Sequence, residues 1–309
     1  MAQRTIELIG APIEAGAGTR GCVMGPAALR VAGIDATFAS LGFNVIDRGD
    51  LAPVVDRDVQ LAGAARNAAE IAGWTRALEA AAYRALERGA FPVFLGGDHS
   101  LSMGSVSGAA RHAAAQGRPL FVLWLDAHTD FNTPRTSLSG NMHGMPVAFF
   151  CGEAGFDGIL PAGRPVVAPQ NVYQLGIRSI DPAERDAIAQ RGVNVFDMRA
   201  VDERGTPAIM RDLIAAVGAA NGMLHVSLDV DFLDPEVAPG VGTTVPGGAT
   251  FREAHLVMEM LCDSGLATAL DIVELNPFLD DRGKSARIMV ELAASLFGRR
   301  IFDRPTQAA

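Results

Sequence analysis

The chain has few cysteines and no long apolar run. Cys22, Cys151 and Cys262 are far apart and odd in number, so they form neither a CxxC motif nor a disulfide framework. Such cysteine usage is typical of a reducing compartment, and we expect a cytoplasmic protein. No apolar run approaches the ~20 residues that a membrane-spanning helix needs, and the run near the N-terminus is too short for a signal peptide. We therefore expect no membrane partner.

Basic residues are also in deficit. Lys and Arg total 26 against 35 Asp and Glu, which gives a formal net charge of −9. Because binding to phosphates needs clustered positive charge, we expect no nucleic-acid partner. The 309 residues could hold two ordinary domains or one large α/β domain. Neither a linker nor an internal repeat divides the chain, which favours a single domain over residues 1–309.

Short apolar runs alternate with longer helix-forming segments along most of the sequence. Gly63–Arg88, Arg252–Ser264 and Lys284–Phe297 have compositions typical of helices, and Pro26 suits the first turn of another helix. Strand–helix alternation of this kind predicts a parallel sheet with helices on both faces. The predicted strands are Thr5–Ile9, Asn44–Asp47, Pro92–Leu95, Phe121–Leu125, Val172–Gly176, Asn194–Asp197, Leu224–Leu228 and Ala269–Glu274.

Polar clusters follow three of these strands where each strand ends. They are GGDH at 96–99, DAHTD at 126–130 and DVD at 229–231. The carboxyl ends of parallel strands share one edge of a sheet, so the clusters should converge. Side chains at alternate positions of an extended segment point the same way, which would bring the polar groups of each cluster together. Each motif alone is more often a cap or a loop feature, but three together favour a functional site.

Converging carboxylates repel one another unless a counter-charge is present, and a pair of divalent cations would supply it. Oxygen and imidazole ligands without thiolate favour Mn²⁺ or a similarly hard cation over structural Zn²⁺. Two such cations can lower the pKa of a water held between them, which indicates hydrolysis. The candidate ligands are His99, Asp126, His128, Asp130, Asp229 and Asp231.

Five segments resemble the ureohydrolase family and follow its order: 96–100, 126–132, 139–144, 227–235 and 271–277. The resemblance implies a three-layer α/β/α sandwich of arginase type around an eight-stranded parallel sheet. It also implies two Mn²⁺ ions, bridged by a hydroxide that attacks a guanidinium carbon and releases urea. One ion would be bound by His99, Asp126, Asp130 and Asp229, and the other by Asp126, His128, Asp229 and Asp231.

The same resemblance assigns catalytic roles to Asp130, His143 and Glu274. His143 matches the family's proton-transfer histidine, and a near-neutral pKa suits that task. An isolated histidine of this kind would instead be a satisfied loop residue. Glu274 matches the residue that binds the guanidinium; its alternative role is an ion pair with a neighbouring arginine. Thr243 matches a threonine that supports this orientation.

Family members differ in how they hold the far end of the substrate. After DAHTD the chain has Asn132, Ser137, Ser139 and Asn141, short uncharged donors that resemble the arginase loop for an α-carboxylate. Asp181 matches the aspartate near the α-ammonium and suits equally the N-cap of a helix at Pro182. The resemblance, closest to bacterial arginases, implies hydrolysis of L-arginine to L-ornithine and urea by a homotrimer or homohexamer.

Several alternatives stay open. An agmatinase or another ureohydrolase of guanidino compounds would share the metal ligands, and a non-catalytic guanidino- or metal-binding protein belongs to a different class. A two-metal phosphoesterase would show a Gly-Asn-His motif where this chain has Gly140-Asn-Met-His. Phe232 replaces a family glycine, which leaves fine specificity open. The formal GxGxxG at 16–21 is a weak nucleotide signal and predicts a loop near the site rim; Arg20 is either solvated or an interface residue.

Overall fold

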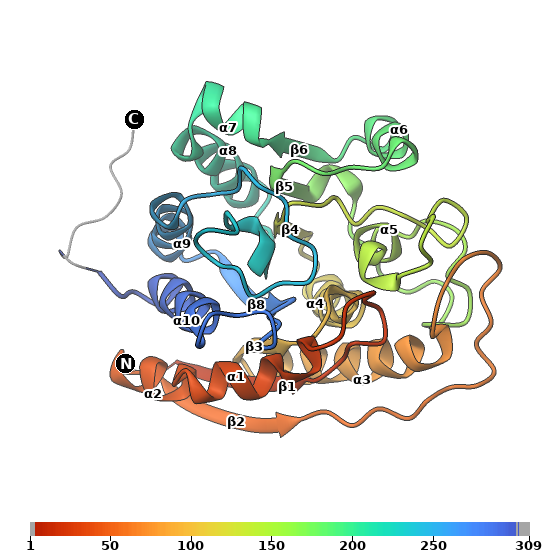
Figure 1. Ribbon diagram of the computed structural model, residues 1–309, viewed down its shortest axis with the longest axis horizontal. Coiled ribbons are helices and arrows are strands. Elements are labelled where there is room, and N and C mark those ends of the chain that lie inside the picture. Colours follow the sequence, from red (N-terminus) through yellow and green to blue (C-terminus); the bar gives the residue numbers. More distant parts are fainter. Residues whose placement is uncertain (1–3, 301, 303–309) are drawn as a thin grey trace.

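Eight parallel strands form one sheet in the part of the chain that the structure describes, residues 4–300 and 302 of a computed structural model. The strand order is β2-β1-β3-β8-β7-β4-β5-β6 (Figure 1). The three strands that precede the polar clusters, β3, β7 and β4, therefore lie in the middle of the sheet. The strands are β1 Thr5–Ala11, β2 Asn44–Asp50, β3 Phe91–Gly96, β4 Leu120–Leu125, β5 Val172–Ile177, β6 Asn194–Asp197, β7 Met223–Asp229 and β8 Ala267–Val273.

Strand β4 shows why the central strands are apolar along their whole length. Leu123 and Leu125 point into the hydrophobic core on one face of the sheet, whereas Val122 and Trp124 point into the core on the other face. Successive side chains of a strand face opposite sides, so a strand covered on both faces needs apolar residues at every position. The continuous run FVLWL is explained by this double burial.

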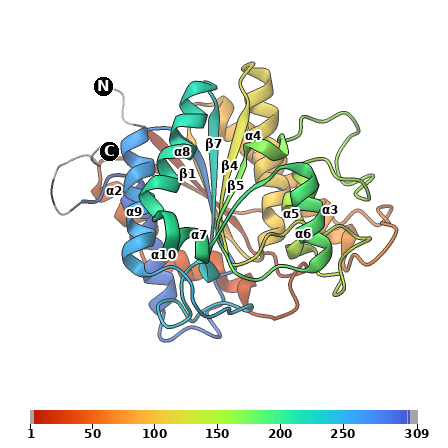
Figure 2. The same ribbon diagram turned by 90° about the horizontal axis from the view of Figure 1, so that it is seen from above.

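Helices cover both faces of the sheet and give three layers, which Figure 2 shows with the sheet nearly edge-on. The three-layer α/β/α architecture predicted from the sequence is confirmed. One face is covered by α3 Ala68–Glu87, α4 Ser102–Ala115, α5 Pro146–Phe150 and α6 Pro182–Arg191. The other is covered by α1 Gly25–Val31, α2 Ile34–Ser40, α7 Met198–Arg204, α8 Thr206–Ala219, α9 Phe251–Ser264 and α10 Lys284–Leu296.

All eight predicted strands are present; β6 has the predicted ends, and the other seven strands differ from the prediction at one or both ends. Strand β8 ends at Val273, so Glu274 lies just beyond the strand rather than within it. The helix predicted from Gly63 begins only at Ala68. Gly63 has φ 110° and Asn67 has φ 55°, values outside the right-handed helical region, so the helix cannot include them. Pro26 lies in the first turn of α1, as predicted.

Among the described residues, no single helix is long and apolar enough to cross a membrane. The segments Cys22–Val31 and Ile34–Ser40 reach that length and composition only as a pair, with a bend of 41° between them. Leu29, Ile34 and Phe38 of this pair are fully buried in the core beside the sheet.

Candidate active site

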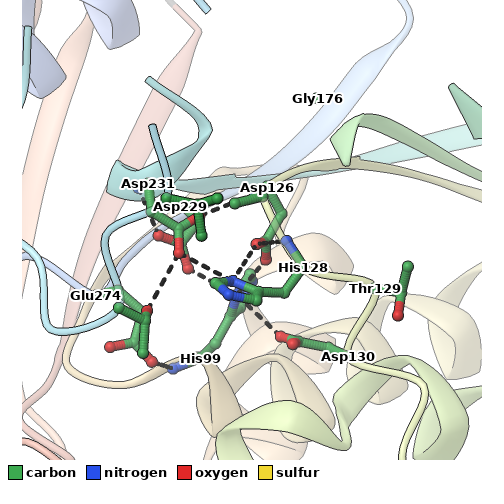
Figure 3. A network of polar contacts seen from close by, with 12 residues as sticks. His99, Asp126, His128, Thr129, Asp130, Gly176, Asp229, Asp231 and Glu274 are labelled. Carbon is green, nitrogen blue, oxygen red and sulfur yellow. Dashed lines mark hydrogen bonds and ion pairs between the residues drawn. The ribbon is translucent and has the colours of Figure 1, made fainter. Parts of the chain in front are cut away.

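The three polar clusters meet at the carboxyl edge of the sheet, around a cavity of about 200 Å³. Every residue that the sequence predicted for the site lines this cavity, from the metal-ligand candidates to the uncharged donors of the 132–141 loop. Figure 3 shows the candidate ligands pointing toward one another from three chain segments. We call His99, Asp126, His128, Asp130, Asp229 and Asp231 the site cluster.

The turn after β3 explains the two glycines that precede His99. A Cβ on Gly97 would lie only 1.8 Å from the carbonyl oxygen of Ile13, so no other residue fits between the ends of β1 and β3. Asp98 then accepts hydrogen bonds from the backbone N–H groups of Gly16 (2.7 Å) and Ser100 (2.9 Å). Asp98 therefore fixes the turn, and the His99 ring is left to face the cavity.

The two other clusters reach the cavity through turns rather than extended chain. Beyond Leu125 the strand has ended, and Asp130 has φ 48°, in the left-handed region. Asp231 lies in a short 3₁₀ turn, in which Asp229 Oδ1 accepts from the Asp231 N–H at 2.8 Å. The prediction of alternating side chains on an extended segment was therefore wrong in its geometry. In each motif the first aspartate accepts a hydrogen bond from the backbone N–H of the residue two positions later. The turn that this bond stabilises brings the carboxylates together.

His99 lies at the centre of the first ligand group. Its Nδ1 is 3.0 Å from Asp126 Oδ2, 3.3 Å from Asp130 Oδ2 and 3.0 Å from Asp229 Oδ2. Yet His99 Nδ1 and Asp126 Oδ2 are buried without a hydrogen-bond partner. One imidazole nitrogen cannot donate to three carboxylates, so these atoms are arranged as ligands around a common point. The donor set fits a hard divalent cation.

His128 lies in the second ligand group. Its Nδ1 is 3.0 Å from Asp231 Oδ2 and 3.4 Å from Asp126 Oδ1. Asp126 thus directs one oxygen toward each histidine, as expected for a carboxylate shared by two cations. In each of the groups His99–Asp126–Asp130 and Asp126–His128–Asp231, the ligand atoms lie within 4.8 Å of one another.

The pKa shifts of the site cluster show that its negative charge is not balanced by the protein. Burial raises the pKa of Asp130 and Asp229 well above the usual range, and neighbouring carboxylates raise it further. Burial lowers the pKa of His128, but its hydrogen bonds to Asp126 and Asp231 outweigh this and raise the pKa to about 12. Without a metal, the cluster can compensate its negative charge only by binding protons.

Glu274 and His143 form a contact on another wall of the cavity. His143 Nδ1 lies 2.8 Å from Glu274 Oε1, which also accepts from the His99 N–H at 2.8 Å. The ion pair with an arginine that the sequence left open for Glu274 is not formed within the described residues; His143 takes that place. Burial raises the pKa of Glu274, but the charge of His143 outweighs it and lowers the pKa.

The rim of the cavity carries hydroxyl groups that remain able to donate. Ser137 Oγ accepts from the Gly140 N–H at 3.0 Å, and Ser139 Oγ accepts from the Asn141 N–H at 3.1 Å. Because these oxygens act as acceptors toward the backbone, their hydrogens are available to a ligand. In the same wall, Asn132 Nδ2 donates to Asp181 Oδ2 at 3.1 Å.

Thr243 and the 16–21 loop complete the rim. Thr243 Oγ1 donates to Asp231 Oδ2 at 3.2 Å, which links it to the site cluster rather than to Glu274. The backbone N–H of His143 donates to the carbonyl of Gly16 at 3.2 Å, so the loop lies beside the site, as predicted. The side chain of Arg20 is exposed.

Glu184 is a cavity residue that the sequence prediction missed. It is buried and accepts from the Phe131 N–H (2.8 Å) and the Asp181 N–H (3.1 Å), which joins the residue just before the 132–141 loop to the start of α6. Burial raises the pKa of Glu184. The spacing of Asp181 and Glu184 matches a helix capping box, a signal that predicts the helix start but not a place in the cavity wall.

The comparisons with known proteins agree with this geometry. The sequence model of the arginase family matches residues 4–298. The chain belongs to the arginase family. It is 56% identical to an arginase of Brucella melitensis over 301 residues, which cover 97% of this chain and 98% of that one. The arginase of Agrobacterium fabrum is 53% identical over 306 residues, covering 99% of this chain and 94% of that protein.

A solved member of the arginase family has the same fold. The native arginase from Bacillus caldovelox superposes with a TM-score of 0.90 at 39% identity, covering 97% of this chain and all of that one. The three-layer sandwich is thus the arginase fold, and the family is metal-dependent, in keeping with the ligand groups around His99 and His128.

Proposed function

We propose that this protein hydrolyses L-arginine to L-ornithine and urea. One observation carries the proposal: a single cavity joins a carboxylate–histidine cluster suited to cations with a loop of uncharged hydroxyl and amide donors. The first part suits hydrolysis, and the second suits an amino acid's α-carboxylate. Arginase family membership and the names of the close relatives support the same reaction.

We further propose two Mn²⁺ ions as the cofactor. The first would be bound by His99, Asp126, Asp130 and Asp229, and the second by Asp126, His128, Asp229 and Asp231. The shared position of Asp126 between the two histidines supports this division. A bound pair of such cations supplies an activated water at neutral pH.

The protein's own side chains orient the substrate and move the proton. Glu274 binds the guanidinium, because a buried carboxylate and a planar cation complement each other in charge and hydrogen bonding. Burial lowers the pKa of His143, but the charge of Glu274 outweighs it and raises the pKa, a shift that suits a group donating a proton to the leaving amine. Asp130, the third catalytic residue, is the member of the site cluster that precedes the loop beginning at Asn132, and it would orient the attacking water.

The far end of the substrate lies against the rim. Ser137 and Ser139 donate to the α-carboxylate through hydrogens that their backbone contacts leave available, and Asn132 and Asn141 supply amide donors. Asp181 lies near the α-ammonium and Thr243 supports the metal-binding wall. Agmatine has no carboxylate for these donors, so the loop favours arginine over agmatine.

Urea release from L-arginine and from agmatine, measured in parallel, tests the proposal. The protein is first treated with a chelator and then reloaded with Mn²⁺. We expect urea from arginine alone, and only after reloading. Urea from agmatine alone would keep the metal site but overturn the substrate, and no urea from either compound would reject ureohydrolase activity toward both.

We also propose that residues 1–309 form a single domain, that the protein assembles as a homotrimer or homohexamer, and that it is cytoplasmic. The single sheet, with strands from Thr5 to Val273, supports the first point. The three unpaired cysteines, two of them buried, support a reducing compartment. Light scattering of the purified protein gives the mass of the assembly, and a monomer would contradict the second point.

A further inference from the structure

A series of buried polar side chains connects His99 to the interior of the sheet. His99 Nε2 lies 2.8 Å from the Oγ of Ser227, and Ser227 Oγ lies 3.3 Å from the Oγ of Ser102. Ser102 Oγ in turn donates to Asp271 Oδ2 at 2.7 Å. Ser227, Ser102 and Asp271 are all 0% exposed. Because solvent does not reach them, each group depends on the next for its hydrogen bond.

The inner end of this series is held firmly. Asp271 Oδ2 accepts a second hydrogen bond from Ser105 Oγ at 2.7 Å, and it lies 2.9 Å from Nε2 of His225, which is also fully buried. We call His225 and Asp271 the buried pair. They lie on the adjacent central strands β7 and β8, while both serines that donate to Asp271 are on α4.

The donor and acceptor of each hydrogen bond in the series follow from the bond between Ser102 and Asp271. A serine hydroxyl has a single hydrogen. Ser102 uses its hydrogen on Asp271, so toward Ser227 it can only accept. Ser227 must therefore donate to Ser102, and toward His99 Nε2 it can only accept. That leaves the proton of the neutral His99 ring on Nε2 and the lone pair on Nδ1.

We propose that Asp271, Ser102 and Ser227 are positioning residues that fix the tautomer of His99, so that Nδ1 is free to bind a cation. The inference rests on the metal site proposed above. It explains why His99 Nδ1, facing three carboxylates, has no hydrogen-bond partner. Residues that do not touch the metal but hydrogen-bond to a ligating histidine fix its tautomer, and this raises the affinity for the metal. His128 differs, because its side chain is 27% exposed and solvent can serve its second nitrogen.

Two serine variants on the same helix test the inference. Ser102→Ala removes the acceptor for Ser227, whose hydrogen can then turn to His99 Nε2 and favour the wrong tautomer. We expect its affinity for one of the two Mn²⁺ ions, measured by calorimetry, to fall about tenfold. Ser105→Ala removes an equally buried hydroxyl from the same oxygen of Asp271 but lies off the path to His99. This control should bind Mn²⁺ like the wild type.

A purely structural role predicts a different result. The two variants would then lose thermal stability and Mn²⁺ affinity to similar extents, which would overturn the inference. Wild-type affinity in a folded Ser102→Ala variant would also overturn it.

The tautomer can also be measured without any variant. In the metal-free wild type, at a pH high enough to leave the His99 ring neutral, ¹⁵N NMR should place its proton on Nε2, and a proton on Nδ1 would reject the inference even if Ser102→Ala fails to fold. Both readouts are separate from urea release. A wild type without arginine hydrolysis refutes the proposed function, whereas an active wild type with the opposite tautomer refutes only the positioning role.

Discussion

The site cluster and the buried pair are built from the same residue types within one sheet, yet their charges are balanced differently. The site cluster sets four carboxylates against two histidines at a cavity. The buried pair sets one carboxylate against one histidine, with the hydroxyls of Ser102 and Ser105 on the same carboxylate oxygen. In the first, the missing counter-charge must come from a bound cation; in the second, two hydroxyls and an imidazole of the protein itself surround the single carboxylate.

The comparison shows that residue type alone does not mark a functional site. A buried carboxylate that contacts a histidine and accepts two serine hydroxyls needs no bound ion, and removing it leaves its partners without that contact in the interior. Excess carboxylate around a cavity costs folding free energy through repulsion and burial, so it indicates a ligand of opposite charge. The two regions should therefore respond in opposite ways to the same substitution.

The largest expected effect is on the buried pair. Asp271→Ala leaves His225 and two serine hydroxyls without their partner, and we expect the free energy of unfolding to fall by about 3–5 kcal/mol. The measurement is urea-induced unfolding of the metal-free protein. An unfolding free energy equal to that of the wild type would show that the buried pair does not stabilise the fold.

The matched change in the site cluster is Asp231→Ala. It removes a proposed ligand of the ion near His128, so we expect loss of that ion and a fall in activity of about a hundredfold or more. Because repulsion among the carboxylates is relieved, the metal-free variant should be at least as stable as the metal-free wild type. A fully active variant with two bound ions would refute the ligand assignment.

A smaller effect separates the rim from the site cluster. The double variant Asn132→Ala/Ser139→Ala removes two proposed donors to the substrate carboxylate, and we expect KM for arginine to rise about tenfold or more, since hydrogen bonds to charged groups contribute about 1.5–3 kcal/mol. Mn²⁺ affinity, measured by calorimetry, should not change. Equal losses of substrate and metal binding would indicate misfolding or a wrong map of the site.

The smallest effect concerns Glu7, which is buried and has its counter-charge within the protein in Arg48 and Arg88. Burial raises the pKa of Glu7, but hydrogen bonds from Arg88 and Arg48 outweigh it, so the pKa lies below its usual value. A lowered pKa stabilises the fold above the unfolded-state pKa, and the gain is lost as pH falls through the folded-state pKa. Glu7→Gln should cost about 1 kcal/mol at pH 7, with the difference shrinking on acidification below pH 5. A difference constant from pH 7 to pH 4 would contradict this assignment.

The sequence predicted the strands well because central strands have continuous apolar runs. The exact ends of helices and strands depend on the backbone angles of single residues, and these were not predicted. The turn-forming φ of Asn67 could not be read from a helix-favouring composition, so the helix start was misplaced. The convergence of the site cluster was predictable, since parallel strands place their carboxyl ends together. Its turn geometry was not, because the hydrogen bond from the Asp231 N–H to Asp229 depends on the folded backbone.

The contacts behind the site were harder to predict. Nothing in the spacing of Ser102, Ser227 and Asp271 indicates that they meet, because they lie on one helix and two strands more than a hundred residues from the helix. Glu184 carried a signal in its capping-box spacing with Asp181, but helix capping alone does not predict a place in a cavity wall.

Two site residues have backbone conformations that are unfavourable for their residue type. Asp130 (φ 48°) and Glu274 (φ 62°) adopt left-handed conformations that glycine or asparagine would adopt with less strain. Each such residue costs about 1–3 kcal/mol, and at these two positions the carboxylate that faces the cavity offsets this cost through its function. A descendant of this chain released from its chemistry would gain stability by accepting glycine or asparagine at these two positions. Glycine or asparagine at both positions would thus mark a relative that has kept the fold and lost the reaction.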